Sequence, residues 1–274
     1  MISPVKRLSI AALLVIVAVS SSRADEFAGK KWPAAQQVSI DNIKHDAFDT
    51  LLKKYVDTDG MVDYKAWHNN HTDRLALVNY LDELSKANPN AHAQRNAQLA
   101  YWINAYNALT IEGILRVYPT TSIRKHTAKL FGYNIWKKLY LYTGSTKINL
   151  DSIEHKVLRQ MNEPRIHFAI VCASISCPRL LNEAYTAAKI ENQLVTNTTD
   201  FFSRSQNLTI DQRSSSLKLS AIMSWFGTDF GDTTAKQIEA IGPYFPEAAK
   251  TFVSSGKYSV KYLDYNWKLN ARKK

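Results

Sequence analysis

The sequence lacks the motifs that mark the common nucleotide-dependent and metal-dependent enzymes. None of its 9 glycines builds a phosphate-binding loop or a GxGxxG dinucleotide fingerprint, and no HExxH metalloprotease motif is present. His68 and His71 are three positions apart, but no further ligand type follows nearby, and a zinc site needs three or four ligands. We therefore predict neither a cofactor nor a metal.

Long apolar runs are also scarce, and the run near the N-terminus has the features of a secretory signal peptide. Two basic residues precede the run 8–19, and the small residues Ser22 and Ala24 follow it. The run is shorter than the ~20 residues of a spanning helix, and no cysteine lies close enough to carry a lipid. We expect cleavage after Ala24 and a soluble mature chain, residues 25–274, in the periplasm or outside the cell.

Acidic residues are fewer than basic ones. The chain has 24 aspartates and glutamates against 35 lysines and arginines, and three of these basic residues belong to the expected leader, which leaves the mature part with a net charge of +8. An exported basic protein meets anionic lipid headgroups and cell-wall polymers before it meets nucleic acid. We expect weak association with an anionic membrane or cell-wall surface and no nucleic-acid binding.

Hydrophobic periodicity predicts a single α+β domain without internal repeats. A helix within the range 91–118 has few charges and many aromatic residues, so we expect it at the centre with most faces covered. Other helices are predicted at 41–56, 72–87, 151–161 and 186–203, with short ones between 220 and 255. Strands are predicted at 61–64, 166–172 and 258–265, and hairpins at 133–149 and 208–219.

The two cysteines lie five positions apart in the densest cluster of reactive side chains, residues 165–180. In an oxidising compartment Cys172 and Cys177 can form a structural disulfide if the intervening loop turns back. Alternatively, one thiolate is a nucleophile whose pKa is lowered by a neighbouring imidazole or a helix N-terminus. If 166–172 is a strand, His167 and Cys172 point to opposite faces, so a partner for the thiol must come from elsewhere.

Two further groups of polar residues are candidates. Asn104 and Asn107 lie inside the expected central helix, where their amides need hydrogen-bond partners. Glu154 and His155 follow Asp151, which has the position of a helix N-cap; a cap and a half-buried surface histidine explain this pair without any catalytic role.

Taken together, these segments resemble the domain-of-unknown-function 547 family. The resemblance is carried by YWINAYNAL at 101–109, LDSIEH at 150–155, HFAIVCAS with SCP at 167–178, and LDYNW at 263–267, and it spans about residues 57–270. The family itself looks like a distant relative of the papain-like and transglutaminase-like fold, in which a central helix packs on a small, mostly antiparallel sheet. The resemblance implies that His167 takes the place of the family's strand histidine, whereas Asn104 or a neighbour stands where the fold's helix thiol would be.

Two hypotheses follow. In the first, a papain-like cleft binds a peptide-like or thiol-containing small molecule, and a cysteine attacks an acyl or disulfide centre with a histidine as base. In the second, the protein is a non-catalytic binding module with a Cys172–Cys177 disulfide. For the first we assign catalytic roles to Cys172, Cys177, His167, His155 and Glu154, and ligand contacts to Asn104, Asn107, Ser174 and Ser176.

Overall fold

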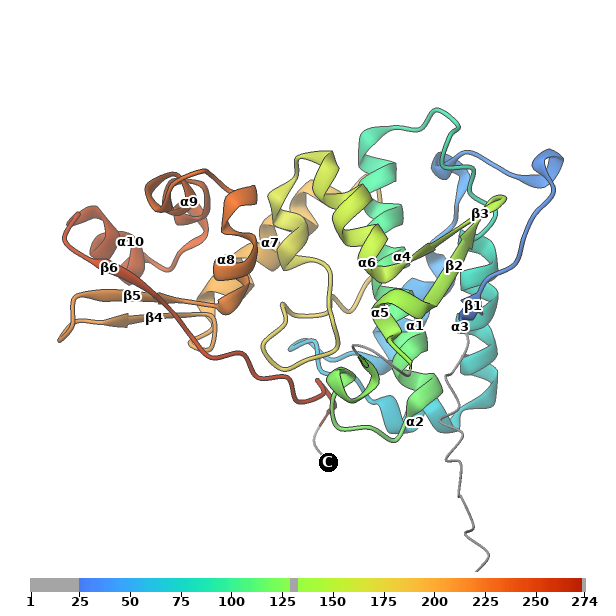
Figure 1. The fold of residues 1–274 in the computed structure, drawn as a ribbon, viewed down its shortest axis with the longest axis horizontal. Coiled ribbons are helices and arrows are strands. Elements are labelled where there is room, and N and C mark those ends of the chain that lie inside the picture. The colour runs from blue at the N-terminus through green and yellow to red at the C-terminus, as the bar shows by residue number, and fades with distance from the viewer. Residues whose placement is uncertain (1–24, 129–132, 273–274) are drawn as a thin grey trace, which may run out of the picture.

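The computed structural model describes residues 25–128 and 133–272, so the expected signal peptide and its cleavage site lie outside the described residues. The chain is folded as the α+β protein that the periodicity predicts, with a larger lobe of helices and one small sheet and a smaller lobe built around a second sheet (Figure 1). Within the described part, no helix combines the length and apolarity needed to cross a membrane.

The larger lobe is organised around α4 (Arg95–Val117), which is buried along nearly its whole length. Its low charge leaves no polar face for solvent, so the other elements cover it on several sides. The helices around it are α1 (Asp46–Tyr55), α2 (Tyr64–Asn69), α3 (His71–Leu84), α5 (Ile135–Lys138) and α6 (Leu150–Ser152), and the sheet is β1 (Glu26–Ala28), β2 (Leu139–Thr143) and β3 (Thr146–Asn149). Here β1 runs parallel to β2, and β2 forms an antiparallel hairpin with β3.

The smaller lobe has its own apolar core. In this lobe β4 (Leu208–Asp211) and β5 (Ser216–Leu219) form the predicted hairpin, β6 (Ser259–Tyr262) adds a parallel edge, and α8 (Ala221–Phe226), α9 (Thr234–Ile241) and α10 (Glu247–Ser254) cover it. The first half of α7 (Ile190–Ser203) packs in the core of the larger lobe and its second half in that of the smaller one. This helix therefore ties the two lobes together.

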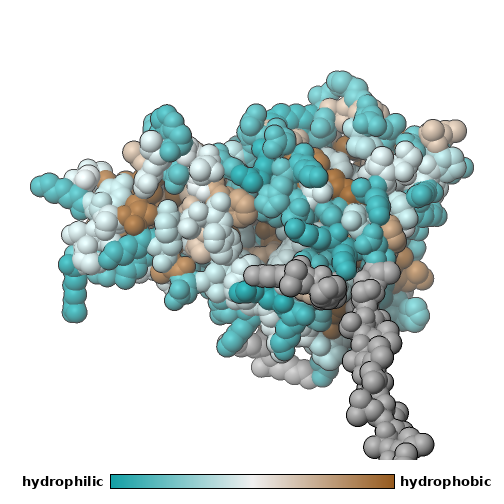
Figure 2. All heavy atoms as spheres, viewed as in Figure 1, coloured by the Kyte–Doolittle hydropathy of each residue, from teal (hydrophilic) through white to brown (hydrophobic). Residues whose placement is uncertain are grey.

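After β6 the chain returns from the smaller lobe to the larger one (Figure 1). Its backbone bridges Ser174 at Leu269 and Val62 at Ala271. Figure 2 shows hydrophilic side chains over most of the visible face, with smaller apolar areas between them. The returning segment, residues 263–271, places aromatic side chains at the junction of the lobes.

The segment 166–172 is not the strand that its apolar pattern predicts. Pro164–Phe168 is a 3-10 helix that Pro164 begins, with the Arg165 amide donating to the Glu163 carboxylate, and no strand follows it up to Cys172. The backbone of this stretch bonds to a side chain instead of a neighbouring strand: Asn107 donates to the carbonyl of Ala169 (3.0 Å) and accepts from the amide of Val171 (2.9 Å). The strand expected at 61–64 is also reduced to bridges at Val62, because α2 begins at Tyr64.

Candidate functional site

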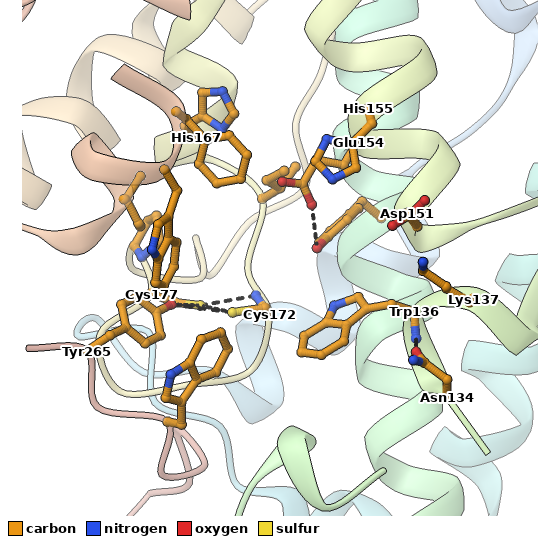
Figure 3. Close-up of a pocket in the computed structure, with 17 residues that line it drawn as sticks. Asn134, Trp136, Lys137, Asp151, Glu154, His155, His167, Cys172, Cys177 and Tyr265 are labelled. Carbon is orange, nitrogen blue, oxygen red and sulfur yellow. Dashed lines mark hydrogen bonds between the residues drawn. The ribbon is translucent and has the colours of Figure 1, made fainter. Parts of the chain in front are cut away.

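A cleft of about 260 Å³ lies where the two lobes and the returning segment meet (Figure 3). Six aromatic residues line it: Tyr106, Trp136, Trp225, Phe226, Tyr265 and Trp267. The polar lining includes Asp151, Glu154, His155 and His167, and both cysteines open onto the same space. Five of the predicted catalytic residues therefore line one cavity, namely Cys172, Cys177, His167, His155 and Glu154.

The two cysteines are free thiols, so the predicted disulfide is absent from this structure. Their sulfur atoms lie 2.7 Å apart, whereas a disulfide bond is about 2.05 Å long. The loop between them turns back as the disulfide hypothesis required, with the Cys177 amide donating to the carbonyl of Ser174 (3.1 Å). The condition for the disulfide is therefore met, but the covalent bond is not formed.

Hydroxyl and amide donors converge on the Cys177 sulfur. The Tyr265 hydroxyl lies 3.1 Å from it, the Cys172 backbone N–H 3.1 Å and the Ser174 hydroxyl 3.4 Å. Tyr265 and Ser174 also reach the Cys172 sulfur, at 3.4 and 3.1 Å. Donors aimed at a buried sulfur stabilise its thiolate form more than its thiol form.

These contacts separate the pKa values of the two thiols. Burial alone would raise the pKa of Cys177, but hydrogen bonds from the side chains of Cys172, Ser174 and Tyr265 outweigh it and lower that pKa to about 7. The pKa of Cys172 is raised well above its ordinary value, first by its hydrogen bond to Cys177 and then by burial. The contacts therefore favour the thiolate form of Cys177 over that of Cys172.

Glu154 supplies a carboxylate to the same cavity. It lies in the helical turn Ile153–Val157 and accepts a hydrogen bond from the hydroxyl of Tyr106 on α4 (3.1 Å). Burial raises its pKa, and the nearby His155 and Arg159 oppose that rise only in part. The structure gives the N-cap of this region to Asn149, whose side chain accepts from the Ser152 amide, so the expected capping role of Asp151 is wrong.

His167 and His155 are engaged away from the sulfurs. The His167 ring stacks on Phe226 with 4.3 Å between centroids, and its Nε2 lies 2.8 Å from the carboxylate of Asp229. Arg159 donates two hydrogen bonds of 2.6 Å to the same carboxylate. His155 Nδ1 lies 3.3 Å from Arg159. Among the described residues, no imidazole forms a hydrogen bond with either thiol, and burial lowers the pKa of His167.

None of the four predicted ligand contacts is among the residues that line the cleft, and three of them bind backbone groups around it. Asn104 pairs through both amide atoms with the backbone of Tyr185 (2.8 and 3.0 Å), and Asn107 holds the segment that leads into Cys172. Ser174 contacts both sulfurs, and the Ser176 hydroxyl accepts from the amide of Asn266 at 2.9 Å. Neither asparagine lines the cleft, because the amide groups of both form hydrogen bonds with the backbone.

The sequence interpretation missed the aromatic walls and Asp229. Tyr265 and Trp267 stood within the LDYNW segment, whose aromatic density was the available signal, but nothing local tied that segment to the cysteine loop. Trp225 and Asp229 come from the smaller lobe and carry no motif of their own. These two residues reach the cleft because the lobes pack together, and no short sequence pattern predicts that packing.

Comparison with protein families supports the resemblance seen in the sequence. The model described as "Protein of unknown function, DUF547" matches residues 90–202, which include the central-helix motif, 150–155 and the cysteine loop. Searches against curated proteins and against solved structures each gave no match. The papain-like relationship stays a prediction. Residues 90–202 of this chain therefore belong to the DUF547 family.

Proposed function

We propose that the cleft performs thiol–disulfide exchange on a small thiol-containing or peptide-like molecule, with Cys177 as the attacking thiolate and Cys172 as the resolving thiol. The observation that carries the proposal is the approach of the two sulfur atoms to 2.7 Å at an open, aromatic-lined cavity. A pair so placed needs little movement to reach the bond length of a disulfide.

The reaction balances without any further oxidant than the substrate disulfide, RSSR. The Cys177 thiolate attacks one sulfur of RSSR, which forms a protein–SR mixed disulfide and releases RS⁻. The Cys172 thiol then loses its proton to the departing thiolate or to solvent and attacks the Cys177 sulfur. A Cys172–Cys177 disulfide forms and the second RS⁻ leaves, taking from solvent the proton that Cys177 lost on ionising, so the protein dithiol is oxidised and RSSR is reduced to two thiols.

The environment of the pair favours exchange over acyl transfer. A thiol exchanges best when its pKa is near the ambient pH, and the pKa of Cys177 is lowered to about 7. An acyl-transfer mechanism of the papain type places a base in contact with the nucleophile, whereas His155 and His167 are bound to Arg159 and Asp229. Export to an oxidising compartment, which the N-terminal sequence predicts, would supply disulfide substrates.

The test is trapping of the mixed disulfide with bis(2-hydroxyethyl) disulfide at pH 7. The Cys172→Ser variant should accumulate the adduct on Cys177, because the resolving thiol is gone. The Cys177→Ser variant should react slowly, and the parent protein should end as the intramolecular disulfide. Peptide mass spectrometry locates each adduct. A folded parent protein that stays reduced, or an adduct that accumulates on Cys172, would show that the proposal is wrong.

A further inference from the structure

We propose that this exchange site selects small disulfides and thiols that carry an alkylammonium group; the inference rests on the proposed function and names its substrate class. The grounds are the aromatic side chains that line the cavity beside the sulfurs and a carboxylate in the same cavity that forms no ion pair with any described residue.

The aromatic side chains surround the cysteines from several directions. Trp225, Tyr265 and Trp267 form one continuous group, with ring centroids 4.5 to 5.8 Å apart. Trp136 meets Trp267 edge to face at 6.3 Å, and Figure 3 places Trp136 and Tyr265 on opposite sides of the two sulfurs. The electron-rich faces of such rings attract cations and not anions: the Arg124 guanidinium already lies over Trp267 at 5.2 Å and that of Arg159 over Phe226 at 5.4 Å, and the remaining faces would attract an ammonium group.

The carboxylate of Glu154 favours a cation over an anion in the cavity. Its carboxylate points into the cavity in Figure 3 and accepts from the Tyr106 hydroxyl, but within residues 25–128 and 133–272 it forms no ion pair. The other formal charges of the lining, those of Lys137 and Asp151, cancel. An entering ammonium would therefore ion-pair with Glu154, whereas a carboxylate on the ligand would meet both this charge and the Cys177 thiolate.

The dimensions favour a short ligand. A cavity of about 260 Å³ is smaller than the ~300–1,000 Å³ typical of sites for drug-sized molecules. Trp225 is 47% exposed, so the aromatic wall extends to the mouth of the cleft, where the second half of a disulfide can remain in solvent. A two-carbon aminothiol joined by a disulfide has this form.

For cystamine the exchange is written with all atoms accounted for. The Cys177 thiolate attacks one cystamine sulfur, forms the Cys177–cysteamine mixed disulfide and releases cysteamine thiolate, which takes up the proton that Cys172 loses. Cys172 then attacks the Cys177 sulfur and releases the second cysteamine as a thiolate, which takes from solvent the proton that Cys177 lost on ionising. The protein dithiol is oxidised, and one cystamine is reduced to two cysteamines.

The experiment compares three symmetric disulfides of similar size: cationic cystamine, neutral bis(2-hydroxyethyl) disulfide and anionic dithiodiglycolate. Second-order rate constants for oxidation of the full mature protein at pH 7 and low salt are each divided by the constant for the uncharged thiol 2-mercaptoethanol, which removes the intrinsic reactivity of the disulfide. We expect the normalised constant for cystamine to exceed that for the neutral disulfide about tenfold and dithiodiglycolate to be slowest.

Variants of Glu154 and Trp225 test whether these side chains cause the preference for cystamine. Glu154→Gln should remove most of it, and Trp225→Ala, which replaces an exposed side chain and should fold normally, should weaken it several-fold. Glu247→Gln makes the same charge change at a side chain that is 86% exposed on α10 and should keep the full preference.

The outcomes separate the two proposals. Equal normalised constants for the three disulfides, or a preference that survives in both Glu154→Gln and Trp225→Ala, would overturn the proposed selectivity. The proposal of thiol–disulfide exchange would still hold. A loss of preference in Glu247→Gln as large as in Glu154→Gln would also overturn it, because net charge alone would then explain the effect. If none of the disulfides oxidises the folded protein, the proposed function fails and the selectivity fails with it.

Discussion

Removal of one hydroxyl should shift the ionisation of the reactive thiol. In the Tyr265→Phe variant the ring stays in place against Trp225 and Trp267, and only the O–H that lies 3.1 Å from the Cys177 sulfur is lost. The pKa of Tyr265 itself is raised well above its ordinary value, chiefly by burial, so its oxygen carries a proton at neutral pH and acts as the donor. The variant therefore tests a single hydrogen bond to the thiolate.

The size of the shift follows from the contacts that remain. A hydrogen bond to a charged group contributes ~1.5–3 kcal/mol, and the lower end applies here because Cys172 and Ser174 keep donating to the same sulfur. This corresponds to ~1 pKa unit. The pKa of Cys177, about 7 in the parent, should rise to roughly 8, and the rate of thiolate alkylation at pH 7 should fall about fivefold.

The assay is alkylation by iodoacetamide from pH 5 to 9. Both cysteines lie in the peptide 166–179, so fragment ions must assign the label to Cys172 or Cys177. Tyr262→Phe is the matched control, since Tyr262 is 46% exposed on β6 and no contact joins it to a sulfur among the described residues. Identical midpoints in the parent and in Tyr265→Phe, or preferential labelling of Cys172, would refute the reasoning.

Two further predictions concern stability. Asn107→Leu and Asn104→Leu should each lower the free energy of unfolding by about 1–3 kcal/mol in denaturant titrations, because each leaves buried backbone groups unpaired. Only Asn107→Leu should also change the alkylation profile of Cys177. Equal alkylation profiles in the two variants would contradict the role of Asn107 in placing the cysteine loop. The second prediction uses His45, whose pKa burial lowers from 6.5 to about 4. The unfolded chain then binds the proton first, so the free energy of unfolding should fall as pH drops from 6.5 to 4, and a His45→Gln variant with an unchanged slope would count against this assignment.

The sequence was sufficient where one short pattern decides the structure. Low charge and aromatic density predicted that α4 would be buried, and it is. Polar turns between alternating residues predicted both hairpins, which pair as Leu141 with Ile148 and Ile210 with Leu217. In each case the deciding interactions join residues close in the chain, or a helix and any apolar surface that covers it.

It failed where a distant side chain replaces a regular backbone partner. The run 166–172 has the composition of a buried strand, but the amide of Asn107 satisfies Ala169 and Val171, and no partner strand is needed. The position of Asn107 was known, and so was its need for a partner, yet the pattern does not say which backbone it would meet. The sequence therefore predicted which residues belong to the candidate site, but not how they lie relative to one another.

The parts of the proposed site come from different portions of the chain. Both cysteines, Ser174 and Glu154 belong to the DUF547 region, whereas Trp225 and Tyr265 lie beyond its end at residue 202. Tyr265 packs against the cores of both lobes while its hydroxyl contacts both sulfurs, so the ionisation of Cys177 depends on how the returning segment closes over the family region. In the proposed reaction the sulfur pair would supply the chemistry, and the later residues would adjust its pKa and select the substrate.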